Sequence, residues 1–400
     1  MRRRAKALVG VLSLGLLAGG GWLAVGPELR ALALTHPTDT DVLFWSTAQR
    51  DAGFRALDQL GWVVGNRTVE RGEQVHPLPP GEPLVLPASF DLPRYLAHQR
   101  VAAMVVLHDG QVIYEHYGLG FGPQGRWTSF SVAKSLTSTL VGAALQDGAI
   151  RSLEDPVSRY VPDLAGSPYD QVSLRQLLTM TSGVRWNEDY GDPQSDVARF
   201  NAATPDPGVD ATVSYMRDLP RRFPPGEHWA YKTGETNLIG VVVSQATGKP
   251  LADYLSEKVW APYGMEQQAT WLLGSTGHEI SGCCVQATTR DMARFGQFVL
   301  DDGVIDGMRV VPEGWFEQAG TKQADIGQPG RGYGFQWWTY DDGAFAAQGI
   351  FGQGIFIDRA RRLVIASNAN WPVASEHTYW SEREAFYRAV QQALDAAQLR

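Results

Sequence analysis

The sequence predicts an α/β protein of the α+β type, with one central antiparallel sheet flanked by helices and a mainly helical lobe inserted into it. Three observations carry this prediction. Residues 103–117 are two β-rich runs joined by Asp109-Gly110, a strong signal for a hairpin turn. Residues 150–285 follow helix and loop patterns, and strand-forming stretches return only near the carboxyl terminus. One sheet built from both ends of the main domain satisfies this order.

Composition excludes several classes of function. The 400 residues are 44% hydrophobic and 20% charged, with a net charge of −8. This acidic balance, without a basic stripe, argues against nucleic acid as a partner. The two cysteines, Cys283 and Cys284, are adjacent, so they cannot join distant segments, and a bond between such neighbours would be strained. Because neither Cys-x-x-Cys nor His-Glu-x-x-His occurs, no metal and no cofactor are expected.

Residues 1–30 differ from the rest of the chain. Residues 2–6 are mostly basic and precede an uncharged run at 7–27 that is long enough to span a bilayer. The basic flank predicts that the start stays in the cytoplasm and that the rest is exported, to a periplasmic or other extracytoplasmic location. Residues 1–30 are therefore expected to be a signal peptide or a membrane anchor. Residues 31–33 are only a weak cleavage signal, so both alternatives stay open.

The remainder divides into a leader and a main domain. Residues 31–90 carry Thr, Pro and Gly clusters and are expected to form an extended leader that wraps or tethers the core. The main domain is expected at 91–400. Its sheet would come from about 91–130 and 287–400, and its helical lobe from about 131–286.

Ser131-Val-Ala-Lys134 supplies a candidate nucleophile and base. Glycine and proline break the preceding chain, and apolar residues then recur with helical period from Leu136, which predicts a helix that begins near Ser131. At 3.6 residues per turn, Ser131 and Lys134 share one helix face. A lysine kept neutral by burial can activate a serine hydroxyl, and the helix N-terminus would favour the alkoxide. Taken alone, the serine is equally well explained as a helix cap.

A second candidate, Tyr231, lies where a loop is expected to become a helix that runs to about Ala246. Its phenol could relay a proton there, although a lone tyrosine is more often a packed aromatic. Before it, residues 174–183 are expected to form a short helix closed by glycine, and residues 184–210 a loop.

The carboxyl-terminal part supplies the second half of the sheet in three strand-forming stretches: residues 332–340, 344–349 and 356–366. The last stretch is expected to fold back on itself at residues 358–361. Residues 379–398 are expected to form a closing helix, since Phe386, Val390 and Leu394 recur at i, i+4 and i+8.

Five motifs follow one another along residues 95–395. They are Ser131-Val-Ala-Lys134, Leu177-Leu-Thr-Met-Thr-Ser-Gly183, Phe223-x-Pro-Gly226-x-x-Trp229-x-Tyr231, Ala287-Thr-Thr-Arg-Asp-Met-Ala-Arg-Phe-Gly296 and Gly349-Ile-Phe-Gly-Gln353. With this order the chain resembles the serine β-lactamase and penicillin-binding-protein superfamily, on its class C and esterase side. Within that superfamily the loop at 189–195 is similar to that of the 6-aminohexanoate-dimer hydrolases.

The resemblance implies a serine hydrolase that cleaves an amide or ester through a covalent acyl-enzyme, without a cofactor. Ser131 would be the acylated nucleophile, Lys134 would take its proton, and Tyr231 would relay protons to the leaving group. The backbone N–H groups of Ser131 and Ile350 would form the oxyanion hole.

The resemblance also implies substrate contacts, but two positions depart from the family pattern. Tyr190 would contact the substrate amide, and Trp186, Gln348 and Gly349 are expected beside the substrate. The second motif often has Asn where this chain has Thr233. The third motif, Lys-Thr-Gly in β-lactamases, begins here with Ala347, so the cation that grips a β-lactam carboxylate is missing.

The expected function is that of a 6-aminohexanoate-dimer hydrolase-like amidase acting on a small molecule. The alternatives are a carboxylesterase or weak β-lactamase and, in another class, a catalytically idle penicillin-binding-type sensor. The complete Ser/Lys/Tyr set disfavours the idle sensor. The sequence leaves the physiological substrate and the oligomeric state open.

Overall fold

Seven antiparallel strands form the main sheet of the computed structural model, which describes residues 22, 25–37, 42–60, 65–200 and 202–398. Their order is β3-β2-β13-β12-β11-β10-β9. Their bounds are Val101–His108 (β2), Gln111–Tyr117 (β3), Arg331–Tyr333 (β9), Trp338–Tyr340 (β10), Phe345–Gln348 (β11), Gly354–Asp358 (β12) and Leu363–Ala369 (β13). Because β2 pairs with β13, the two ends of the domain meet inside one sheet, as the sequence predicts.

The hairpin β2–β3 turns at Asp109-Gly110, as expected. Both residues have positive φ, 48° and 74°, which matches the tight turns that follow the twist of two strands. The stretch 332–340 is not one strand as predicted. It divides into β9 and β10, and between them Gln336 has a φ of 65°, a value that no extended strand has.

Helices cover both faces of this sheet. On β13, Val364 and Ala366 face α12 (Thr289–Leu300), whereas Leu363 and Ile365 face α4 (Leu92–His98) and the closing helix α14 (His377–Gln398). This alternation follows the two-residue period of a strand. A Cβ at Gly296 would lie 2.4 Å from Val364 Cγ1, so this glycine lets α12 approach the sheet closely.

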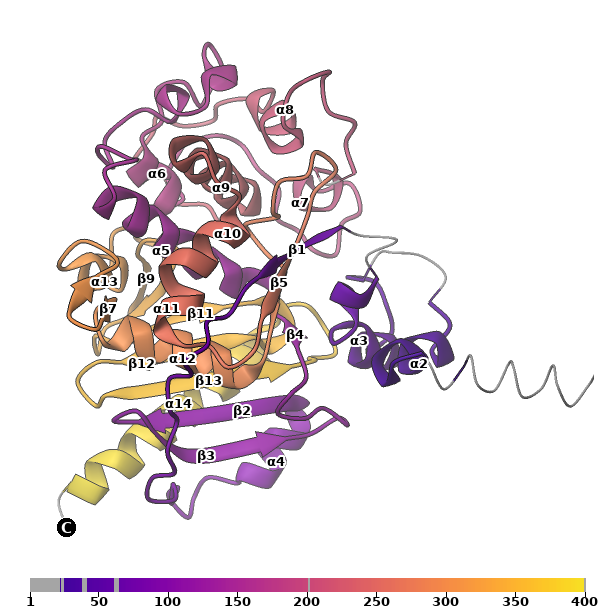
Figure 1. The fold of residues 1–400 in the computed structure, drawn as a ribbon, viewed down its shortest axis with the longest axis vertical. Coiled ribbons are helices and arrows are strands. Elements are labelled where there is room, and N and C mark those ends of the chain that lie inside the picture. Colours follow the sequence, from indigo (N-terminus) through magenta and orange to yellow (C-terminus); the bar gives the residue numbers. More distant parts are fainter. Residues whose placement is uncertain (1–21, 23–24, 38–41, 61–64, 201, 399–400) are drawn as a thin grey trace, which may run out of the picture.

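The remaining helices of the main domain fall between residues 133 and 263, where the sequence predicts the inserted lobe, except for one short helix later in the chain. They are α5 (Ala133–Gln146), α6 (Leu174–Leu178), α7 (Asp196–Arg199), α8 (Ala211–Arg217), α9 (Thr233–Thr247), α10 (Leu251–Leu255), α11 (Ala261–Tyr263) and α13 (Trp315–Ala319). Figure 1 shows α6, α8 and α9 gathered at the upper end of the molecule, with the sheet in the lower half. Helix α6 ends at Leu178, short of the predicted glycine, and the expected loop at 184–210 contains α7.

A second, smaller sheet was not expected from the sequence. It has the order β1-β5-β6-β4, with bounds Asn66–Val69 (β1), Ala269–Leu272 (β5), Val285–Ala287 (β6) and Trp127–Thr128 (β4). The prediction of only helices and loops in 150–285 is therefore wrong for β5 and the start of β6. These strands are short and fully buried, so they show no alternation of polar and apolar residues. A third pair, Val304–Ile305 (β7) and Met308–Arg309 (β8), forms a small hairpin.

The leader is not extended throughout, because it forms the helices α2 (Pro27–Leu34) and α3 (Thr47–Gly53). Ser46 and Gln49 form a capping box that starts α3. Immediately after α3, the fully buried ring of Phe54 packs on Phe130 and Phe351. The leader thus touches the residues that flank two expected catalytic positions.

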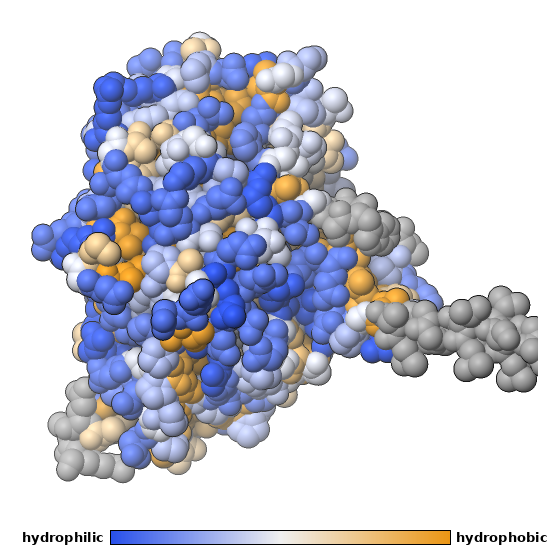
Figure 2. Space-filling view, viewed as in Figure 1, coloured by the Kyte–Doolittle hydropathy of each residue, from blue (hydrophilic) through white to orange (hydrophobic). Residues whose placement is uncertain are grey.

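The expected signal or anchor falls mostly outside the described residues, because 1–21 and 23–24 are not described. Within the described part of the chain, no helix is long and apolar enough to cross a membrane. On the face shown in Figure 2, hydrophilic side chains predominate and the hydrophobic ones form separate small patches.

Candidate active site

Ser131 and Lys134 occupy the start of α5, where the sequence places them. Ser131 lies in a single 3₁₀ turn, Phe130–Val132, that leads into the helix. Lys134 is on the first turn of α5 and is 1% exposed. The distance from Lys134 Nζ to Ser131 Oγ is 3.0 Å. The predicted spacing of one helical turn therefore brings the two side chains into contact.

Three acceptors surround the Lys134 nitrogen. In addition to Ser131, Nζ lies 3.1 Å from Thr233 Oγ1 and 2.7 Å from the carbonyl oxygen of Gly282. Burial lowers the pKa of Lys134 to about 8. A neutral amine has two N–H groups and one lone pair. If Thr233 and Gly282 accept the two N–H groups, the lone pair is free to take the proton of Ser131.

Glu188 fixes the direction of the Thr233 hydroxyl and is the residue that sequence reasoning missed. Its carboxylate accepts hydrogen bonds from the Thr233 hydroxyl and, at 2.9 Å, from the Thr233 backbone N–H. It also accepts one from the Tyr190 hydroxyl at 2.6 Å and one from the indole N–H of Trp186. The local order Trp186-x-Glu188-x-Tyr190 hints at a carboxylate between two aromatic donors, but it does not show that this carboxylate reaches Thr233. The charge of Glu188 raises the pKa of Lys134 and so opposes the larger effect of burial.

Tyr231, the expected proton relay, lies in the loop before α9. Its ring stacks on Trp338, with 5.5 Å between centroids, and Lys134 Nζ lies 5.1 Å from the ring centroid. Burial raises the pKa of Tyr231 and outweighs a hydrogen bond with Ser131 that lowers it. The phenol is therefore protonated near neutral pH and can donate a proton beside the nucleophile.

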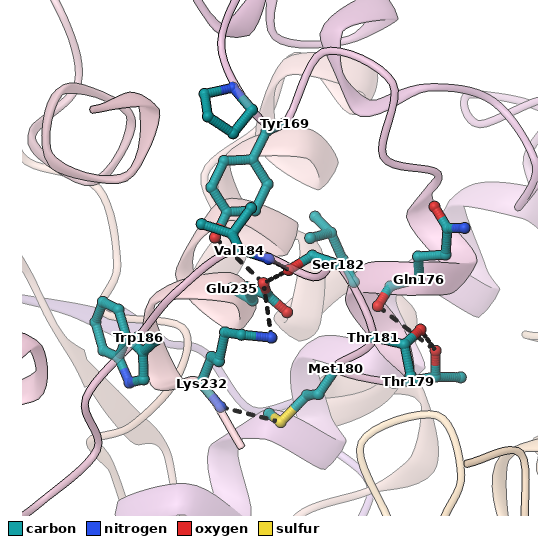
Figure 3. Close-up of polar contacts among 12 residues, drawn as sticks. Tyr169, Gln176, Thr179, Met180, Thr181, Ser182, Val184, Trp186, Lys232 and Glu235 are labelled. Carbon is teal, nitrogen blue, oxygen red and sulfur yellow. Dashed lines mark hydrogen bonds and ion pairs between the residues drawn. The ribbon is translucent and has the colours of Figure 1, made fainter. Parts of the chain in front are cut away.

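A buried ion pair anchors the chain just after Tyr231. Lys232 Nζ lies 3.3 Å from Glu235 Oε1, and both side chains are almost fully buried. Figure 3 shows Tyr169, Ser182 and Lys232 converging on Glu235. Burial raises the pKa of Glu235. The backbone N–H of Lys232 also points at the sulfur of Met180, at 3.3 Å, so the loop that carries Tyr231 is held at two points.

The end of β11 brings the second expected oxyanion donor to the serine. A Cβ at Gly349 would lie 2.8 Å from the carbonyl oxygen of Ser129 and 3.2 Å from the Cβ of Phe130. Only glycine permits this approach. The backbone at Ile350 therefore runs beside the turn that contains Ser131, and both residues are 8% exposed. This juxtaposition suits a pair of N–H groups aimed at one oxygen.

The other expected substrate-binding residues take different positions. Tyr190 packs in the cluster that contains Phe130 and Ile350, next to the nucleophile. Trp186 packs on the helical lobe, where a Cβ at Gly234 would lie 2.8 Å from its ring. The side chain of Gln348 donates to the Tyr340 hydroxyl at 2.7 Å and lines a cavity of about 340 Å³ beside α14. Tyr190 is thus close to Ser131, whereas Trp186 reaches the site through Glu188.

The described residues contain no group of three or more His, Cys, Asp or Glu side chains placed to hold a metal ion.

In class, the protein is a serine hydrolase, because a family model of such enzymes and a 33% identical hydrolase each match most of the chain. The chain belongs to the Beta-lactamase family, whose family model matches residues 94–388.

Relatives and solved structures agree with this assignment. The chain is 33% identical to the 6-aminohexanoate-dimer hydrolase of Paenarthrobacter ureafaciens over 362 residues, which cover 85% of this chain and 91% of that protein. A Bacillus anthracis structure assigned by name to the 6-aminohexanoate-dimer hydrolases has a TM-score of 0.76 at 24% identity, over 88% of this chain and 95% of that chain. EstCE1, a hydrolase with promiscuous acyltransferase activity, has a TM-score of 0.60 at 13% identity, over 76% and 96%. At these identities the two structures show the fold alone.

Proposed function

We propose that the protein hydrolyses a small linear amide through an acyl-enzyme on Ser131, as a 6-aminohexanoate-dimer hydrolase-like amidase. One observation carries the mechanism: Lys134 Nζ lies 3.0 Å from Ser131 Oγ and has a pKa lowered to about 8 by burial. A lysine in that state is partly neutral near pH 7 and can accept a proton.

Acylation follows from this arrangement. Lys134 takes the hydroxyl proton of Ser131 while Oγ bonds to the carbonyl carbon of the substrate. The N–H groups of Ser131 and Ile350 stabilise the negative oxygen. As the C–N bond breaks, Tyr231 gives its proton to the leaving amine, and Lys134 returns a proton to Tyr231. The amine leaves, and the acyl group remains on Ser131.

Deacylation reverses the proton movements. Water takes the place of the amine, and Tyr231, relaying to Lys134, accepts a proton as the water oxygen bonds to the acyl carbon. The Ser131 C–O bond then breaks and Oγ regains a proton. The products are the acid and the amine, and the enzyme returns to its first state.

The substrate class rests on the name of the 33% identical relative and on Tyr190, which packs next to the nucleophile. A carboxylesterase is the second candidate. Ala347 is uncharged and 1% exposed, so it offers no cation to the substrate. An uncharged ester does not need that cation. Export through residues 1–30, as a cleaved signal or an anchor, is part of the proposal and rests on the basic start and the apolar run at 7–27.

Labelling with a fluorophosphonate probe, followed by peptide mapping, tests the mechanism. The label is expected on Ser131 and is expected to disappear in Ser131→Ala. Ser138→Ala is the matched control, because Ser138 is also buried on α5 and its Oγ has no hydrogen-bond partner among the described residues. That variant should label and turn over substrate like the parent. Label on another serine, or on none, contradicts the proposal.

A further inference from the structure

We propose that the bond between Cys283 and Cys284 positions the catalytic pair, so that turnover depends on the oxidation state of these two residues. The structure joins the two neighbouring sulfurs in a disulfide. The inference rests on the proposed function, since it concerns the same Ser131 and Lys134.

The amino side of the disulfide holds the lysine. The carbonyl oxygen of Gly282, the residue just before Cys283, lies 2.7 Å from Lys134 Nζ and is the shortest of the three contacts of that nitrogen. This carbonyl and the N–H of Cys283 belong to one planar peptide unit. Any rotation of the backbone at Cys283 therefore turns the oxygen that binds Lys134.

The carboxyl side of the disulfide holds the turn of the nucleophile. The backbone N–H of Val285, the residue just after Cys284, donates to Ser129 Oγ at 3.0 Å. In return the Ser129 N–H donates to the carbonyl of Val285 at 2.8 Å. Ser129 lies two residues before Ser131. The four-residue segment 282–285 thus contacts the base at one end and the nucleophile turn at the other, with the disulfide between the two contacts.

The backbone at Cys284 has an uncommon conformation that the disulfide helps to hold. Its φ is 77°, in the left-handed region that residues other than glycine rarely adopt. A bond between neighbouring sulfurs closes a small ring through the peptide unit and restricts the backbone of both residues. Without it, only hydrogen bonds such as that from the Leu272 N–H to the Cys284 carbonyl, at 3.1 Å, oppose a return of Cys284 to negative φ, and such a return would disturb both contacts.

Reduction of the disulfide is a two-electron step, and a reductant can reach both cysteines. Both cysteines are partly exposed, whereas Gly282 and Val285 are buried. A dithiol reductant supplies two electrons and two protons. The S–S bond breaks, two thiols form, and the dithiol becomes a cyclic disulfide. In an oxidising compartment, such as the one that export implies, the bond is expected to persist.

Steady-state kinetics on the full-length enzyme test the proposal, with p-nitrophenyl butyrate as the probe substrate before and after dithiothreitol. Alkylation and mass spectrometry confirm the thiols. Reduction is expected to lower kcat about 10- to 100-fold, the range for a small misplacement of catalytic groups, with little change in KM. Reoxidation is expected to restore kcat. The double variant Cys283→Ser/Cys284→Ser should have the low kcat without reduction, and dithiothreitol should not change it.

A second double variant separates positioning from a general loss of structure. Glycine adopts positive φ at no steric cost, so Cys283→Ser/Cys284→Gly is expected to recover several-fold more kcat than Cys283→Ser/Cys284→Ser. Equal kcat in the two variants overturns the backbone argument. An enzyme that labels at Ser131 and keeps full kcat after reduction overturns the positioning role alone. Absent labelling at Ser131 overturns the proposed function and this inference with it.

Discussion

Thr233 Oγ1 lies 3.1 Å from Lys134 Nζ and joins the start of α9 to the start of α5. The Thr233 hydroxyl donates a hydrogen bond to Glu188, so a lone pair of its oxygen can accept a hydrogen bond from Lys134. Superfamily members that carry Asn at this position would place an amide there. Here the shorter side chain of Thr233 and a carboxylate from the loop at 184–210 form the hydrogen-bond network beside Lys134.

Replacing Thr233 by Val should lower kcat about 10- to 100-fold, because valine keeps the shape and removes the acceptor that holds one N–H of Lys134. The lysine lone pair then loses its direction toward Ser131. Thr233→Ser retains the hydroxyl and is the matched control, with kcat near that of the parent. Steady-state kinetics with p-nitrophenyl butyrate measure both, and a fully active valine variant would show that Thr233 does not orient the base.

The pH dependence of kcat/KM should follow the ionisation of Lys134. Lys134 acts as a base only when neutral, and its pKa is lowered to about 8 by burial, so activity should rise with pH through about 8 and level off above it. Each pH unit below that value should cost about tenfold. Glu188 raises this pKa, so Glu188→Gln should shift the rise of kcat/KM to lower pH. Glu227→Gln makes the same charge change at an exposed position and should leave the pH profile of kcat/KM unchanged.

Local patterns made the fold and the contact between Ser131 and Lys134 predictable. The Asp109-Gly110 turn, the one-turn spacing of Ser131 and Lys134 and the period of α14 each depend on residues close in sequence. The remaining features depend on contacts between distant segments. Glu188 is 45 residues from Thr233, and Gly282 is 148 residues from Lys134. No local period encodes such contacts, and the short buried strands β5 and β6 likewise acquire their form from their neighbours.

Residues 1–40 fused to a reporter that is active only outside the cytoplasm should give activity, because a basic start before an apolar run directs export. Replacing the basic residues at 2–6 by neutral ones should reduce the signal and is the matched control. Fractionation then separates the two open alternatives, since a cleaved signal frees the reporter and an anchor keeps it on the membrane. A silent reporter retained in the cytoplasm would show that the protein is not exported by this segment.

The enzyme should prefer uncharged or amino-terminated linear esters and amides over β-lactams. A β-lactam carries a carboxylate beside its scissile bond, and Ala347 offers it no charge. Arg331, at the start of β9, is a candidate for a substitute cation. It forms an ion pair with Glu384 and lies over the Tyr340 ring, 4.9 Å from its centroid, so its charge already has a partner.

A charge-assisted hydrogen bond contributes about 1.5–3 kcal/mol, so its absence should cost β-lactams roughly 10- to 150-fold in affinity. The proposed oxyanion hole uses backbone N–H groups, so it would support ester and amide acylation without the cation. The measurement is kcat/KM for nitrocefin, p-nitrophenyl butyrate and a linear aminohexanoate dimer on one preparation. Ala347→Lys should improve nitrocefin relative to the ester, because it restores the cation. If nitrocefin exceeds both other substrates by about tenfold (~1.4 kcal/mol) or more, the protein is a β-lactamase with a rebuilt third motif.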